Sequence, residues 1–148
     1  VLEIIGICIW GVALIIESVA DFQKLGFLKK MKKTGMPNQV CSVGLWKYSR
    51  HPNYFAEWMV WNGLVIMAIP SWLALKDMQS EFFNGQVDQI IWLLLGAGLI
   101  YVSRMMYITL VYATGAIPAE YFSVQKRPDY ENYQRTTNRF FPGPTKHL

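Results

Sequence analysis

The chain has 148 residues, of which 53% are hydrophobic and 15% aromatic, and a net charge of +4. Its apolar residues gather in a few long runs, which is typical of a membrane protein and excludes an ordinary soluble domain. The two cysteines, Cys8 and Cys41, are too few for a disulfide framework and lack metal-ligand spacing, so we interpret both as free thiols. The length predicts one membrane domain over residues 1–148, and no nucleic-acid motif is present.

Three stretches are long and apolar enough to cross about 30 Å of hydrocarbon, which takes about 20 residues. They are residues 1–22, 54–75 and 89–114. The second contains Glu57 and Asn62, polar side chains that are costly in lipid. We therefore expect these two residues to face protein, water or a ligand.

Basic residues predict the orientation of the chain. Twelve of the fourteen Lys and Arg residues lie either between the first and second spans or after the third. The connection between the second and third spans, residues 76–88, has one Lys and three acidic residues. Because cytoplasmic loops gather Lys and Arg, the two basic segments should meet on the cytosolic face, or on the matrix face of a mitochondrion. Charge alone leaves open whether they meet lipid headgroups or a polyanionic ligand.

The segment GLWKYSRHPNYFAEWMVWNG, residues 44–63, carries the most chemical information. Proline is favoured in the first turn of a helix, so Pro52 predicts the start of the second span. A helix start attracts anions, and Arg50 adds a charged fork suited to phosphate. Asn53 and Glu57 are four residues apart and should share one helical face below it. The pattern indicates an anion site above a polar pair, as a nucleotide cofactor would need.

This segment resembles the signature of the steroid 5-alpha-reductase-like C-terminal domain. Upstream, Glu17 to Gln23 (ESVADFQ) is similar to the E..AD.Q element that closes the preceding span in that family. Downstream, residues 115–144 resemble its tail, with Glu120, Tyr130, Tyr133 and Pro142 at familiar spacing. The resemblance covers nearly the whole chain.

The resemblance implies an NADPH-dependent reductase of the membrane that acts on a C=C bond of a lipid-like or steroid-like substrate. It places Asn53 and Glu57 at the nicotinamide, with Asp21 and Gln23 lining the same pocket. The phosphates and ribose would be held by Arg50 and His51 together with tail residues. The full set of expected cofactor contacts is Asp21, Gln23, Arg50, His51, Asn53, Tyr54, Glu57, Lys126 or Arg127, Tyr130 and Tyr133.

The family's catalytic acid and substrate contacts lie in N-terminal spans that this sequence does not contain, so the catalytic residues stay unassigned. The chain opens with Val1 and no basic leader, like the middle of a protein. Three readings follow: a trimmed longer chain, a substrate half supplied by another subunit, or a non-catalytic structural subunit of a larger membrane complex.

Methyl transfer is a further alternative, because isoprenylcysteine and phospholipid membrane methyltransferases share an RHPxY element. Their cofactor is S-adenosylmethionine. The Trp-rich EWMVWNG and the E..AD.Q element resemble the reductase branch more closely. His51 has no second His or Cys at ligand spacing, so no metal site is expected.

We thus predict an all-α membrane bundle of three spans, followed by an amphipathic helix near 117–134 that folds back under it. The membrane would be that of the endoplasmic reticulum, the mitochondrial inner membrane or a bacterial inner membrane. Expected partners are membrane lipids, the lipid-like substrate and other membrane subunits, without nucleic acid.

Overall fold

A computed structural model describes residues 1–82 and 86–146. The described chain folds into helices joined by loops and contains no strand. The middle of the acidic connection, residues 83–85, lies outside the described residues. The elements are α1 (Leu2–Lys33), η1 (Gly44–Lys47), α2 (Pro52–Phe82), α3 (Gln86–Ile108), the π-helical η2 (Thr109–Ala113), α4 (Ala116–Lys126) and α5 (Tyr130–Thr136).

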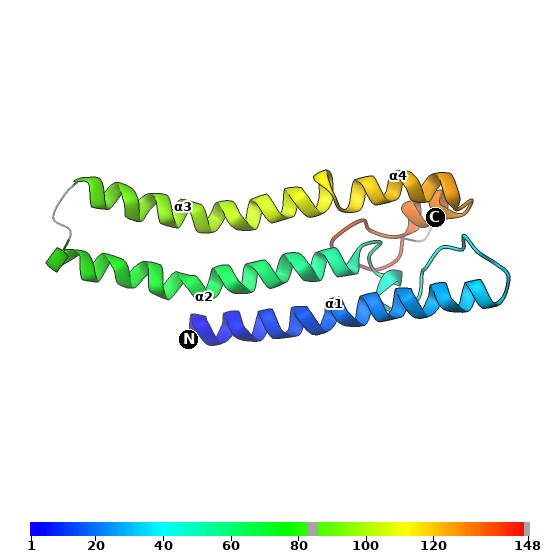
Figure 1. Cartoon of the computed structure of the whole chain (residues 1–148), viewed down its shortest axis with the longest axis horizontal. Coiled ribbons are helices and arrows are strands. Elements are labelled where there is room, and N and C mark those ends of the chain that lie inside the picture. The colour runs from blue at the N-terminus through cyan, green and yellow to red at the C-terminus, as the bar shows by residue number, and fades with distance from the viewer. Residues whose placement is uncertain (83–85, 147–148) are drawn as a thin grey trace.

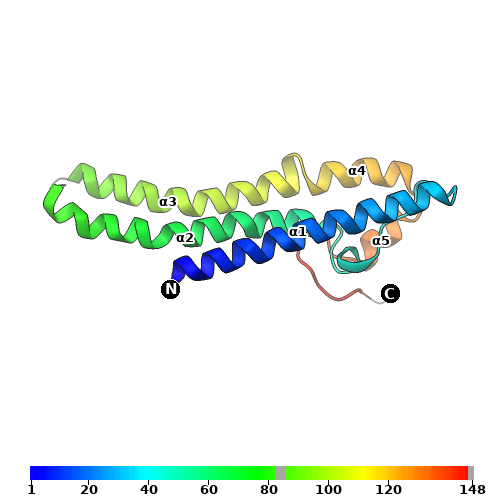
Figure 2. The same ribbon diagram turned by 60° about the horizontal axis from the view of Figure 1, so that its bottom comes forward.

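The long helices lie side by side, with α2 between α1 and α3 (Figures 1 and 2). At the end where α2 begins, α4 continues the line of α3, and η1, α5 and the C-terminal tail gather beside it (Figure 1). We call this assembly, residues 34–51 and 114–146, the cap. The two basic segments therefore lie at the same end of the bundle, and the side of the membrane that this end faces stays a prediction.

Within the described residues, three helical segments are long and apolar enough to cross a membrane: Leu2–Lys33, Pro52–Lys76 and Asp88–Lys126. In each segment, at most 11% of the most apolar 18-residue stretch is buried against the rest of the chain. Large apolar side chains instead face outward, such as Ile100, which is 75% exposed. An apolar surface of this extent needs lipid around it, which confirms the predicted membrane bundle.

Small residues let the long helices approach closely. Gly6 of α1 meets Gly63 of α2, where a Cβ on Gly63 would lie 2.9 Å from the Gly6 carbonyl oxygen. At the far end of the bundle, Trp72 and Trp92 stack with ring centroids 4.3 Å apart. Each indole N–H donates to the other residue's carbonyl, at 2.9 and 3.0 Å. Gly96 leaves room for the Trp72 ring.

The first helix runs past the predicted span, to Lys33. Its last turn contains Lys30, Lys32 and Lys33, and this end of the helix runs beside the cap (Figure 1). The helix ends where Gly35 adopts a left-handed φ of 70° and its N–H bonds to the Lys32 carbonyl, a conformation that glycine adopts without strain.

The tail forms two helices where the sequence predicted one. Pro128 disfavours helical geometry in the residue before it, and Arg127 is extended, with φ −129° and ψ 109°. This break separates α4 from α5. Before α4, the π-turn of η2 and Gly115 redirect the chain, because a Cβ at position 115 would lie 1.8 Å from the Leu110 carbonyl oxygen.

A buried apolar core between η2 and the cap forms around Leu110, Val111 and Phe140. Aromatic rings from α2 and α3 surround it, including Phe55, whose ring meets Phe140 edge-on at 5.8 Å. The tail is thus anchored to the bundle, and the polar side chains of the cap have fixed positions.

Candidate functional site

The most buried charges of the cap form a network around Glu120 of α4. This carboxylate accepts from Arg50 Nε at 2.8 Å and from His51 Nε2 at 3.1 Å. Gln134 donates to it at 3.0 Å, and Arg139 at 3.3 Å. Because Arg50 and His51 directly precede α2, Glu120 supplies the anion that the helix start and its basic residues attract. We call these five residues the Glu120 network.

The Arg50 guanidinium is almost fully engaged within the chain. It donates twice to Glu120, once to the Gln134 carbonyl at 2.6 Å and once to the Thr137 carbonyl at 2.7 Å. These four bonds use four of the five N–H groups that arginine offers, and the residue is 6% exposed. Arg50 therefore fastens α4 and α5 to the start of α2 and leaves little for a phosphate.

His51 lies in the same buried setting, 4% exposed. Burial lowers its pKa below the ordinary value of 6.5, although Glu120 opposes this shift. Since a carboxylate only accepts hydrogen bonds, the neutral ring carries its proton on Nε2. The imidazole ring of His51 stacks on the Tyr54 ring, with ring centroids 5.4 Å apart.

The loop before α2 is fastened to α1 and α5 by side chains. Gln23 Oε1 accepts from the Leu45 N–H at 2.8 Å, and the Trp46 indole donates to the Ala20 carbonyl at 2.8 Å. Tyr133 donates to the Trp46 carbonyl, and burial raises the pKa of its hydroxyl. Gln23 and Tyr133 thus hold the cap together through bonds within the chain.

A second set of polar residues lies outside the Glu120 network. Glu17, Asp21 and Lys24 follow one another along one face of α1 at helical spacing. The carboxylates of Glu57, Asp21 and Glu17 lie near enough to repel one another. Lys24 is attracted by Asp21 and repelled by Arg127. Asn53 lies one turn before Glu57 on α2. We call this set the polar stripe: Glu17, Asp21, Lys24, Asn53, Glu57 and Arg127.

Two cations of the polar stripe line the same cavity, between α1 and the cap. Lys24 and Arg127 both line a small cavity of about 40 Å³, together with Cys41, His51 and Tyr130. Lys24 lies over the Trp46 ring, with Nζ 4.2 Å from its centroid. Arg127 donates to Ser123 Oγ at 2.9 Å, while its buried Nε has no hydrogen-bond partner in the described chain. An anion bound in this cavity would offset the repulsion between the two like charges that line it.

The lower part of the stripe offers unsatisfied hydrogen-bonding groups. Asn53 Oδ1 is buried without a partner among the described residues, which is unusual for a native polar atom and calls for a ligand or water. Glu57 is partly buried and makes no ion pair within the described chain, neither with Arg104 nor with Lys47. Asp21 is exposed beside them.

The remaining predicted residues are divided between the two sets. Tyr130 is buried beside the small cavity that Lys24 and Arg127 line, and burial raises the pKa of its hydroxyl to about 12. Lys126 is exposed, whereas its neighbour Arg127 faces the cavity. The predicted set is therefore brought to one end of the bundle. Asp21, Asn53, Glu57 and Arg127 have free polar groups there, and Arg50, His51, Gln23 and Tyr133 are bonded within the chain.

Sequence reasoning missed two residues of the arrangement. Lys24 was counted only as topology charge, although its spacing from Asp21 places both on one face of α1. Glu120 entered only through the tail resemblance. Its partner Arg50 is 70 residues away, and no local pattern indicates a pairing over that distance.

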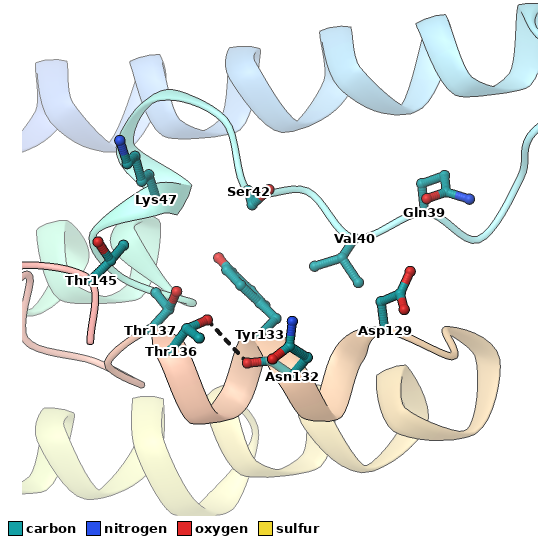
Figure 3. A pocket seen from close by; sticks show the side chains of 10 residues that line it. All are labelled: Gln39, Val40, Ser42, Lys47, Asp129, Asn132, Tyr133, Thr136, Thr137 and Thr145. Carbon is teal, nitrogen blue, oxygen red and sulfur yellow. Dashed lines mark hydrogen bonds between the residues drawn. The ribbon is translucent and has the colours of Figure 1, made fainter. Parts of the chain in front are cut away.

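A larger polar cavity of about 490 Å³ lies on the other side of Tyr133, between the loop around Val40 and α5 (Figure 3). Hydroxyl and amide side chains dominate its walls, with Lys47 near one end and Asp129 near the other. Thr136 donates to the Asn132 carbonyl at 3.0 Å on its floor. Among the predicted cofactor residues in the described chain, only Tyr133 lines this cavity, so it is separate from the polar stripe.

Comparison with protein families decides the kinship of the chain. The family described as "Protein of unknown function (DUF1295)" matches residues 1–137. The chain belongs to this family. The match includes α1, α2, α3 and both tail helices, and so covers the polar stripe and all but Arg139 of the Glu120 network. No curated protein and no solved structure matches the chain.

Proposed function

We propose that this member of the DUF1295 family binds NADPH along the polar stripe and serves a membrane reductase of the steroid 5-alpha-reductase type. The cations Lys24 and Arg127 carry this proposal, because they line one cavity and neither belongs to the Glu120 network, whose members Arg50 and His51 form another part of the wall. The resemblance of residues 44–63 to the reductase signature supports it. The site faces the cytosol or the matrix.

The free groups of the stripe fit the parts of the cofactor. The Arg127 guanidinium, with an unpartnered Nε, and the Lys24 ammonium suit phosphate. Asn53 Oδ1 is an acceptor without a donor and suits a carboxamide or ribose hydroxyl, and Glu57 and Asp21 accept from the same groups. When bound, NADPH supplies the hydride for reduction of a C=C bond in a lipid-like substrate. The chain's part is to hold and orient the cofactor.

The arrangement favours NADPH over S-adenosylmethionine as the ligand. NADPH carries several phosphate charges, which match two clustered cations, whereas S-adenosylmethionine carries a single carboxylate and a sulfonium cation. The reassignment of Arg50 and His51 to the Glu120 network moves the expected phosphate contacts to Lys24 and Arg127. A structural subunit would need no unpaired polar atoms on Asn53 and Arg127.

Fluorescence titration tests the assignment on the protein purified in mild detergent. NADPH binding is followed by energy transfer from tryptophan. Arg127→Gln and Lys24→Gln should each weaken binding about tenfold, since each removes a charged contact to phosphate. Glu57→Gln should weaken binding without lowering the melting temperature.

Lys126→Gln is the matched control, because it removes the same charge one residue away from the cavity on an exposed side chain. Its affinity should stay within about twofold of the parent, since its removal changes only a solvent-screened charge. Equal losses of NADPH affinity in the Lys126 and Arg127 variants would mean that general surface charge, and not the cavity, attracts NADPH. Unchanged affinity in the Lys24, Arg127 and Glu57 variants would refute the site.

A further inference from the structure

A third hollow lies on the side of α2 that faces α3, within the membrane-spanning part of the bundle. This groove between α2 and α3 has a volume of about 570 Å³, within the range of small-molecule sites. Its walls are mostly apolar: Trp58, Val65, Leu99, Ile100, Ser103, Arg104, Tyr107 and Phe141. From Trp58 to Val65 it follows about 10 Å of helix at 1.5 Å per residue, which suits the upper part of an acyl chain.

The polar groups behind the groove are bonded to one another. Ser103 Oγ donates to Asn62 Oδ1 at 2.7 Å, and the Trp58 indole donates to the Ser103 carbonyl at 3.1 Å. Asn62 Nδ2 in turn donates to the Trp58 carbonyl at 2.7 Å. Asn62, for which the sequence predicted a partner in protein, water or a ligand, is thus satisfied within the bundle. These polar groups do not call for a polar ligand.

Arg104 is the exception. Its side chain is exposed, and its guanidinium lies 5.8 Å from the Tyr107 ring centroid. Within the described chain no carboxylate lies at ion-pair distance from it, neither Glu57 nor Asp21. It lies near the cap end of α3, on the level of Trp58, from which a long basic side chain reaches the headgroup region. A cation at the mouth of an apolar groove matches an anionic amphiphile.

We propose that the groove between α2 and α3 binds the acyl chain of an anionic phospholipid whose phosphate pairs with Arg104. The apolar walls take the chain, and the guanidinium offers its fork to the phosphate oxygens. The site is separate from the polar stripe, which lies towards α1 and α4. Lipid binding in the groove can therefore be tested independently of cofactor binding.

Native mass spectrometry of the full chain in mild detergent, titrated with phosphatidylglycerol or phosphatidylcholine, tests the proposal. The parent protein should retain phosphatidylglycerol in preference to phosphatidylcholine. Arg104→Gln should reduce that preference roughly fivefold, the ratio expected for one basic contact to anionic lipid, and Arg104→Lys should largely keep it. Val65→Phe should lower retention of both lipids by filling the groove.

Arg135→Gln is the control, because Arg135 is exposed on α5 away from the groove. Its preference should equal the parent's. Glycerol phosphate, which lacks acyl chains, should fail to displace the lipid. A preference that survives in Arg104→Gln, falls equally in Arg135→Gln, or yields to glycerol phosphate would overturn the proposal. Retention of a second copy of the chain at the expense of lipid would do the same.

Discussion

Glu120 unites the cap because one buried carboxylate satisfies donors from three parts of the chain. It bonds to Arg50 and His51 before α2, to Gln134 on α5 and to Arg139 in the tail. Its side chain is 5% exposed. A buried ion pair need not exceed an apolar pair in stability, but removal of one partner leaves the other charge uncompensated.

Glu120→Gln should therefore destabilise the protein by about 3–5 kcal/mol, because the Arg50 charge stays buried without its counterion. Arg139→Gln should cost less than about 1 kcal/mol, since that side chain is 45% exposed and screened by solvent. Thermal unfolding followed by tryptophan fluorescence in mild detergent measures both. Equal losses in the two variants would contradict the assignment of Glu120 and Arg50 as the buried pair.

The buried His51 predicts a pH dependence of stability. Its pKa in the folded chain is lowered, with Glu120, Arg50 and Lys24 as the charged neighbours. The unfolded chain therefore binds the proton more readily, so stability falls as the pH drops through the unfolded value of 6.5 towards the lower folded pKa. Melting temperatures between pH 7.5 and 5.5 should decline for the parent and less steeply for His51→Gln, which keeps a donor for Glu120. Parallel slopes would exclude His51 as the titrating group.

At the scale of elements, α1 and α2 form the closest helix pair, and glycine at their crossing permits it. A Cβ on Gly63 would meet Trp10 N and the Gly6 carbonyl oxygen, both at 2.9 Å. Gly63→Ala should thus force the helices apart and cost about 1–3 kcal/mol, the usual range for overpacking. Gly11→Ala is the matched control on α1, because its Cβ would have no atom within 4 Å. Equal melting temperatures for the two variants would contradict this crossing.

Elements with local causes could be predicted from the sequence. Hydropathy located the three spans, and Pro52 marked the start of α2. The break between α4 and α5 also has a local cause, since Pro128 ends α4, but helical periodicity on either side masked it. Asn53 and Glu57 were placed on one face by their spacing alone. The Glu120 network and the approach of Lys24 to Arg127 depend on tertiary contacts between distant segments, which periodicity does not encode.

At the scale of the whole molecule, contacts between the cap and the bundle position the polar stripe. The Glu120 network and the core around Phe140 fix α4 and α5 against the start of α2. That fixed position brings Arg127 from α4 to Lys24 on α1, above the acidic part of the polar stripe. In the proposed reductase, buried charges that stabilise the cap thus position the free charges that bind the cofactor.

Mass spectrometry of nucleotides released from the protein purified in gentle detergent tests cofactor binding most directly. The proposed function predicts about one NADP or NADPH per chain, lost in Arg127→Gln and retained in Lys126→Gln. Release of S-adenosylmethionine would identify a methyltransferase instead. A protein that carries no nucleotide, does not bind added NADPH and co-purifies with stoichiometric partner subunits would contradict the proposal and favour a structural role.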